Sequence, residues 1–280
     1  MARFAGIILL LLALLSPVDA ETLRVISLYP GHSDNISAMG GNEILVALSE
    51  NDDDDLLPEL PRVPLRSGAE RILALRPDVV VTRPFAERIN PNMYDILRRS
   101  GVKVISIDPP KWDDFPEYLL KLADSLNLNP VNGISRLNSA LAKLKSPSAK
   151  KPRVFLEATS RELHTCAPDS WPSRLIELAG GVNIADDAEP LREGSTIAPY
   201  GVERLLKNAA SLDVYIIQSG AMNTSTAETF RAREWSSALG HVRVYEIPEK
   251  YISRPSLLGL EKGLKELRYI FGTEDSENAR

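Results

Sequence analysis

Short apolar runs recur along the chain, and longer amphipathic segments separate them. The runs have the length and the valine and isoleucine content of buried strands, and they cover residues 24–28, 78–82, 102–107, 153–157, 213–217 and 242–247. Apolar residues at helical spacing fill much of the intervening sequence. Regular alternation of such strands and helices predicts an α/β fold built on parallel sheets.

Residues 129–144 are predicted to form one helix in the middle of this pattern. Asn129 is a favourable N-cap, and Pro130 then occupies the first helical position, where its missing N–H costs nothing. One apolar stripe follows, formed by Val131, Ile134, Leu137, Leu141 and Leu144. Gly133 is unfavourable in the interior of this helix.

The sequence on the two sides of this helix is similar. Matching strands and helices lie 129, 133, 135 and 140 residues apart, and the pattern Gly-x-Glu-Arg-Ile/Leu-Leu occurs at 68–73 and again at 201–206. We therefore expect two βα lobes of Rossmann-like type, joined by a single long helix, with a ligand cleft between them. Ordinary strand–helix alternation is the alternative explanation. The expected divisions are 21–128 for the first lobe, 129–149 for the connecting helix and 150–272 for the second lobe, before a disordered tail at 273–280.

The first 20 residues have the form of a cleavable signal peptide. Arg3 provides the positive start, residues 7–15 form the apolar core, and a small-x-small site ends at Ala20. The apolar core is too short to span a bilayer comfortably. We expect a mature, soluble periplasmic protein that begins near Glu21.

The net charge limits the possible partners of the chain, and its cysteine content limits the possible sources of its stability. The net charge is −5 and no basic cluster is present, which argues against nucleic-acid binding. Cys166 is the only cysteine, so no internal disulfide can form, and we expect it to be buried and inert.

Three local features lead to specific expectations. Residues 29–48 are predicted to turn from the first strand into a helix that continues to Leu48. The acidic run 51–55 lacks the ligand pattern of a calcium loop and is predicted to be a solvated turn. Ser67 and Glu70 have the spacing of a capping box.

No catalytic motif stands out. The sequence contains no nucleophile elbow, no P-loop and no GxGxxG pattern. His32 and His164 follow corresponding strands of the two lobes and could face each other, but a two-histidine metal site would need further ligands. We expect a protein that is not an enzyme. A metal-dependent hydrolase that uses these two histidines is the catalytic alternative. A periplasmic ligand-sensing module is the non-catalytic alternative.

Several segments give the chain a family resemblance over residues 24–267. They are RVISLYPGHSDNISAMG, GAERILALRPDVVVT, LIELAGGVNIADDA, GVERLL, VRVYEIP and SRPSLLGLEKGLKEL. With them the chain resembles the periplasmic substrate-binding proteins of ABC importers for iron–siderophore complexes, cobalamin and haem. The resemblance implies ligand binding in the cleft between two lobes joined by one helix.

The resemblance also implies a set of binding residues. The cleft candidates are Tyr29, His32, Arg66, Arg83, Phe85, His164, Tyr200, Tyr251 and Arg254. Arginines beside aromatic rings suit an anionic chelate, and the tryptophans common in cobalamin-binding clefts do not fall at these loops. A ferric siderophore is therefore favoured, a corrinoid comes second and haem third. The metal chelate is transported cargo, and no intrinsic cofactor is expected.

The repeated motif acquires a role from the same resemblance. In the family, one acidic residue on each lobe pairs with permease arginines, and the matching positions here are Glu70 and Glu203. The expected partner is the permease dimer of an ABC importer with its ATPase subunits. The binding protein itself is expected to be a monomer.

Overall fold

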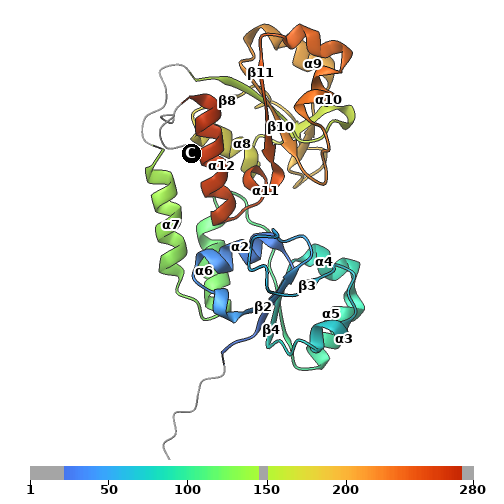
Figure 1. Cartoon of the computed structure of the whole chain (residues 1–280), viewed down its shortest axis with the longest axis vertical. Helices are drawn as coiled ribbons and strands as arrows, with labels where there is room; N and C mark the ends of the chain where they lie inside the picture. Colours follow the sequence, from blue (N-terminus) through green and yellow to red (C-terminus); the bar gives the residue numbers. More distant parts are fainter. Residues whose placement is uncertain (1–21, 145–150, 273–280) are drawn as a thin grey trace, which may run out of the picture.

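The computed structural model describes residues 22–144 and 151–272, which form two βα lobes. The predicted signal peptide and the predicted tail at 273–280 lie outside the described residues. Figure 1 shows one lobe above the other, with α7 (Pro130–Ala142) running along one side between them. The predicted fold class is confirmed.

The first lobe is built on a five-stranded parallel sheet of order β3-β2-β1-β4-β5. Its strands are β1 (Val25–Ser27), β2 (Leu45–Ser49), β3 (Arg62–Val63), β4 (Val79–Thr82) and β5 (Lys103–Ser106). Its helices are α2 (Pro30–Ala38), α3 (Ala69–Leu73), α4 (Pro84–Ile89), α5 (Pro91–Arg99) and α6 (Phe115–Ser125).

The second lobe repeats this topology on a four-stranded parallel sheet of order β11-β10-β6-β8. The strands are β6 (Arg153–Glu157), β8 (Val182–Asn183), β10 (Val214–Ser219) and β11 (Arg243–Pro248), and β7 (His164–Cys166) pairs separately with β9 (Ile197–Pro199). The helices are α8 (Trp171–Leu178), α9 (Val202–Lys207), α10 (Ala227–Arg231), α11 (Glu249–Ile252) and α12 (Leu257–Phe271).

The two strand orders correspond element by element. Strands β2, β1, β4 and β5 of the first sheet have the same neighbours as β8, β6, β10 and β11 of the second. Short 3₁₀ segments lie in the connections, at Asn42–Ile44, Arg161–Leu163, Ala209–Ser211 and Glu234–Leu239. The repeat seen in the sequence is therefore a repeat of topology.

Helix α7 covers Pro130–Ala142 of the connecting helix predicted at 129–149, and residues 145–149 of that prediction lie outside the described residues. Asn129 is the N-cap, and its side chain accepts a hydrogen bond from the Val131 N–H at 3.0 Å. Gly133 has a packing reason, because a Cβ there would lie 2.9 Å from the Met39 side chain at the end of α2. The helix thus packs closely against the first lobe.

The prediction that the first helix continues to Leu48 is wrong. Helix α2 ends at Ala38, and residues Leu45–Ser49 form β2. Gly40 adopts a left-handed φ of 89°, and the Gly41 N–H bonds to the Ile36 carbonyl at 2.9 Å. A glycine in this conformation is a common helix stop.

The predicted capping box is also wrong. Gly68, not Ser67, is the N-cap of α3, and no side chain caps that helix. Ser67 is buried, and its N–H bonds to the Pro64 carbonyl in the preceding turn. The serine therefore belongs to the turn and not to the helix.

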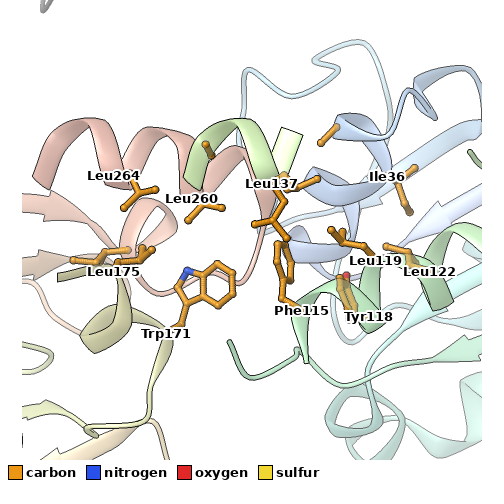
Figure 2. Packing of buried hydrophobic residues seen from close by; sticks show 14 of the residues in the cluster. Ile36, Phe115, Tyr118, Leu119, Leu122, Leu137, Trp171, Leu175, Leu260 and Leu264 are labelled. Atoms are coloured by element: carbon orange, nitrogen blue, oxygen red, sulfur yellow. The ribbon is translucent and has the colours of Figure 1, made fainter. Parts of the chain in front are cut away.

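One cluster of buried apolar side chains continues from the first lobe into the second. Figure 2 shows Phe115 of α6 directed towards Trp171 of α8, with Leu137 of α7 beside them. The Phe115 and Trp171 rings are 4.9 Å apart at 74°, and Trp112 lies 4.8 Å from Trp171. Such aromatic pairs contribute about 0.5–1.5 kcal/mol beyond their buried area. The lobes therefore share part of one core.

Candidate ligand cleft and docking face

The ends of strands from both sheets meet at the lobe junction. Helix α2 begins after β1, and its Asn35 side chain donates to the Pro255 carbonyl at 3.1 Å and accepts from the Leu257 N–H at 2.9 Å. Helix α11 follows β11, and its Lys250 lies 3.1 Å from Asp53 of the first lobe. Open α/β sheets bind ligands at such carboxyl ends of strands.

Three of the predicted cleft residues form a group on the first lobe. The Arg83 guanidinium lies 4.8 Å from the centre of the Tyr29 ring and 5.0 Å from that of Phe85. Phe85 is 45% exposed. Burial raises the pKa of Tyr29, and the Arg83 and Arg254 charges oppose that effect. A cation held against aromatic rings can contact both the flat face and an anionic group of a ligand.

Met222 is a further candidate for a ligand contact, and it was not among the residues predicted from the sequence. It lies three residues beyond β10 and is 53% exposed, just as Phe85 lies three residues beyond β4. A narrow turn presents it, because Gly220 and Asn223 exchange backbone hydrogen bonds of 3.0 and 3.1 Å. Alignment of the two strand ends within the repeat would have identified this position.

Arg254 and Tyr251 lie at the junction, but Arg254 is already paired. Its Nη1 lies 3.2 Å from the Asp34 carboxylate and 3.3 Å from that of Asp53. Tyr251 lines a neighbouring pocket of about 190 Å³ together with Lys250. Ligand pockets usually measure about 300–1,000 Å³, so this pocket can hold only part of a large chelate.

The acidic run at 51–55 is only partly the predicted solvated turn, because Asp54 and Asp55 are exposed but Asp52 and Asp53 are not. Asp52 is buried, its carboxylate accepts from the Ser49 N–H at 2.8 Å, and Asp53 pairs with Arg254 and Lys250. Burial raises the pKa of Asp52 to about 7, and the negative charge of Asp34 acts in the same direction. Two carboxylates of this run therefore belong to the lobe junction.

His32 is a buried structural residue rather than an open ligand. Its Nε2–H is directed at the carbonyls of Thr82 and Ile107, both at 3.1 Å, and its Nδ1 accepts from the Tyr118 hydroxyl at 2.8 Å. Burial lowers the pKa of His32 to about 4, so the ring is neutral at physiological pH. Because both ring nitrogens are engaged, the hydrolase alternative based on His32 and His164 is contradicted.

The other predicted cleft residues have different surroundings. The His164 side chain is mostly buried, with Nε2 3.6 Å from the Glu162 carboxylate. Tyr200 is buried under α9 and donates to the Ile184 carbonyl at 3.2 Å. Arg66 is exposed in the turn before α3. Their contacts do not place these three side chains with Arg83, so their ligand roles stay predictions.

Cys166 and Trp171 contribute to the core. Cys166 is a free, buried thiol, as expected, and burial raises its pKa. Trp171 is 3% exposed and packs between the lobes, so it does not line a cleft as a free aromatic surface.

Glu70 and Glu203 occupy equivalent places in the repeat. Each is the second residue of a short helix, α3 or α9, that leads into β4 or β10. Both side chains are on exposed residues. Figure 1 shows the two helices on the same side of the molecule, opposite α7, with one on each lobe.

The part of the chain that the structure describes has neither a metal-binding cluster nor a membrane-spanning helix. In residues 22–144 and 151–272, no cluster of three or more His, Cys, Asp or Glu side chains is arranged to hold a metal ion. Within those ranges no helix is both long enough and apolar enough to cross a membrane.

Two parallel-sheet lobes, a bridging helix and strand ends that meet between the lobes define a solute-binding protein of the two-lobe class. The sequence profile of the periplasmic binding protein family matches residues 25–251, and the chain belongs to this family. Its members are substrate-binding proteins, so the prediction that the chain is not an enzyme is confirmed, and its ligand is transported cargo rather than a resident cofactor.

Curated and solved relatives cover nearly the whole chain. A vitamin B12-binding protein of Vibrio vulnificus is 26% identical, covering 91% of this chain and 93% of the relative. The structure of a haem-binding protein of Vibrio cholerae has a TM-score of 0.72 at 17% identity, with 89% and 99% coverage. That of a vitamin B12-binding protein of the same species has a TM-score of 0.63 at 24% identity, with 89% and 96% coverage. These structural likenesses concern the fold.

Proposed function

We propose that this protein captures a metal chelate in the cleft between its lobes and delivers it to the permease of an ABC importer. The observation that carries the proposal is the group formed by Tyr29, Arg83 and Phe85 at the strand ends of the first lobe. Met222 presents a second exposed apolar side chain at the corresponding strand end of the other lobe. A large ligand with apolar faces and an anionic group suits such surroundings.

A corrinoid is the first ligand to test. The curated relatives that match most of this chain are named vitamin B12-binding proteins, and a corrinoid offers both apolar edges and a phosphate for Arg83. The ferric siderophore favoured by the sequence comes second, because Arg254 is engaged by two carboxylates and is less available for an anion. Haem is the third candidate.

Titration of the purified protein with cyanocobalamin, a ferric siderophore and haemin tests this ranking. We expect Phe85→Ala and Met222→Ala each to weaken cyanocobalamin binding roughly tenfold, equivalent to about 1.4 kcal/mol. Val131→Ala is the matched control, because Val131 is another exposed apolar side chain and lies on α7. Equal affinities of all three variants and the wild type would contradict a cleft bounded by Phe85 and Met222.

In the proposed delivery step, the two equivalent carboxylates, Glu70 and Glu203, contact the permease. Glu70 and Glu203 would each pair with permease arginines, and charge-assisted contacts from both lobes would fix the orientation of the complex. A sensory partner in place of a permease is the alternative. Stimulation of importer ATP hydrolysis by the liganded protein would favour transport, and its absence with a cognate importer would favour sensing.

A further inference from the structure

The arginine of the repeated motif has no role in ligand capture or in the proposed docking. Arg71 directly follows Glu70, and Arg204 directly follows Glu203. The helices that carry these pairs are short, with five residues in α3 and six in α9. Isolated helices of this length are unstable in water, so their direction depends on contacts with the rest of the lobe.

Each arginine makes such a contact. In the first lobe, Arg71 Nη2 donates to the Arg62 carbonyl in β3 at 3.1 Å. In the second lobe, Arg204 Nη2 lies 2.5 Å from the Asp187 carboxylate and donates to the Asp187 carbonyl at 3.2 Å. The Arg204 guanidinium also lies 4.5 Å from the centre of the Tyr200 ring.

The two contacts reach corresponding parts of the lobes. Strand β2 lies beside β1 in the first sheet, and β8 lies beside β6 in the second. Arg62, in β3, belongs to the connection from β2 to α3, and Asp187 belongs to the connection from β8 to α9. The same motif residue therefore ties the same helix to the same connection in both halves of the molecule.

We propose that Arg71 and Arg204 are positioning residues that orient Glu70 and Glu203 towards the importer. Adjacent side chains on a helix do not face each other, so each arginine can bond to its own lobe while the carboxylate beside it stays exposed. The inference rests on the proposed docking function. The new element is that docking requires each carboxylate to point in a fixed direction. The arginine that follows the glutamate supplies this direction.

The contacts are at the surface, so they affect orientation more than folding. Asp187 is 68% exposed, and the Arg71 bond is also exposed. Exposed ion pairs contribute little to global stability. Variants at these positions are therefore expected to fold and to bind ligand as the wild type does.

Binding to the detergent-solubilised cognate permease–ATPase complex tests the proposal. We expect Arg71→Met and Arg204→Met each to weaken binding roughly tenfold, the size of one charge-assisted contact. Thermal unfolding and cyanocobalamin affinity should not change, and Arg204→Lys should restore part of the binding. Arg99→Met is the matched control, because Arg99 is another exposed arginine that bonds to a backbone carbonyl, that of Asp95.

Combined variants separate the possible failures. If Arg204 acts through Glu203, Arg204→Met should cause no further loss in a Glu203→Gln background. Full additivity would mean that Arg204 contacts the partner itself and would overturn the positioning role. If Arg71→Met and Arg204→Met bind the importer as the wild type does while the Glu→Gln variants bind more weakly, the positioning role is overturned and the docking function stands. Wild-type binding by Glu70→Gln and Glu203→Gln together would overturn the docking function.

Discussion

At the scale of single residues, buried charge characterises the junction between the lobes. Asp34 and Asp53 of the first lobe face Arg254 and Lys250 of the second, so two negative and two positive charges balance. Asp52 is a third carboxylate in the same place. Burial raises its pKa to about 7 with help from the charge of Asp34, and the hydrogen bond from the Ser49 N–H and the charge of Arg254 only partly oppose this.

Replacement of Asp52 should change how stability depends on pH. The folded-state pKa is near 7 and the usual value is 3.8, so the folded protein binds the extra proton between these values. The stability that this proton provides is complete below about pH 4 and is lost as the pH rises to about 7, by up to about 1.4 kcal/mol per pH unit.

Thermal unfolding of Asp52→Asn between pH 5 and pH 8 measures this effect. The asparagine can still accept from Ser49 but cannot ionise, so the variant should gain stability relative to the wild type as the pH rises. Asp54→Asn, at an exposed neighbouring position, is the control and should follow the wild type. Parallel pH profiles of Asp52→Asn and the wild type would show that Asp52 does not titrate in this range.

The burial of these residues could not be predicted from the sequence, because it depends on distant segments of the chain. The run at 51–55 has the composition of a solvated turn, and its burial depends on Lys250 and Arg254, about 200 residues away. His32 was predicted to face a ligand because it follows a strand. Its burial depends on Tyr118 of α6, which no local pattern links to it.

At the scale of elements, the strands and the connecting helix were predictable because their signals are local. Valine and isoleucine runs identified the central strands, and Asn129 with Pro130 identified the start of α7. Strand β2 was missed because residues 29–48 were assigned to one turn and helix across Gly40, whereas α2 ends at Ala38 and Gly40 has a left-handed φ. Phe85 was named as a cleft candidate from its place after β4, whereas Met222 was not named, because the loops after β4 and β10 differ in sequence.

Two helices stiffen the connection between the lobes. Arg136 of α7 makes a bidentate ion pair with Glu261 of α12, at 2.9 and 2.6 Å. Ser256, the N-cap of α12, donates to Asp34 of the first lobe at 2.9 Å. Together with the shared apolar core seen in Figure 2, these contacts connect the lobes at several points.

This arrangement predicts that the lobes close only slightly on ligand binding. A continuous helix and a shared core cannot bend like a hinge of extended strands without breaking these contacts. Small-angle X-ray scattering of the protein with and without cyanocobalamin should give nearly equal radii of gyration. A marked compaction of the liganded protein would contradict the rigid connection.

At the scale of the whole molecule, the residues proposed for ligand binding and those proposed for docking lie on different elements. The strand-end residues Tyr29, Arg83 and Phe85 belong to the junction side of the first lobe, and α3 and α9 place Glu70 and Glu203 on the two lobes. A ligand that spans the junction would fix the relative position of the lobes. The importer would then meet both carboxylates in one geometry.

Native mass spectrometry of the protein purified from its own periplasm tests the central claim most directly. The account predicts a one-to-one adduct whose mass and visible absorbance are those of a metal chelate, with a corrinoid first among the candidates. The adduct should be lost or reduced in Phe85→Ala. A protein that carries no chelate and fails to bind cyanocobalamin, a ferric siderophore or haemin at micromolar concentration would contradict the claim.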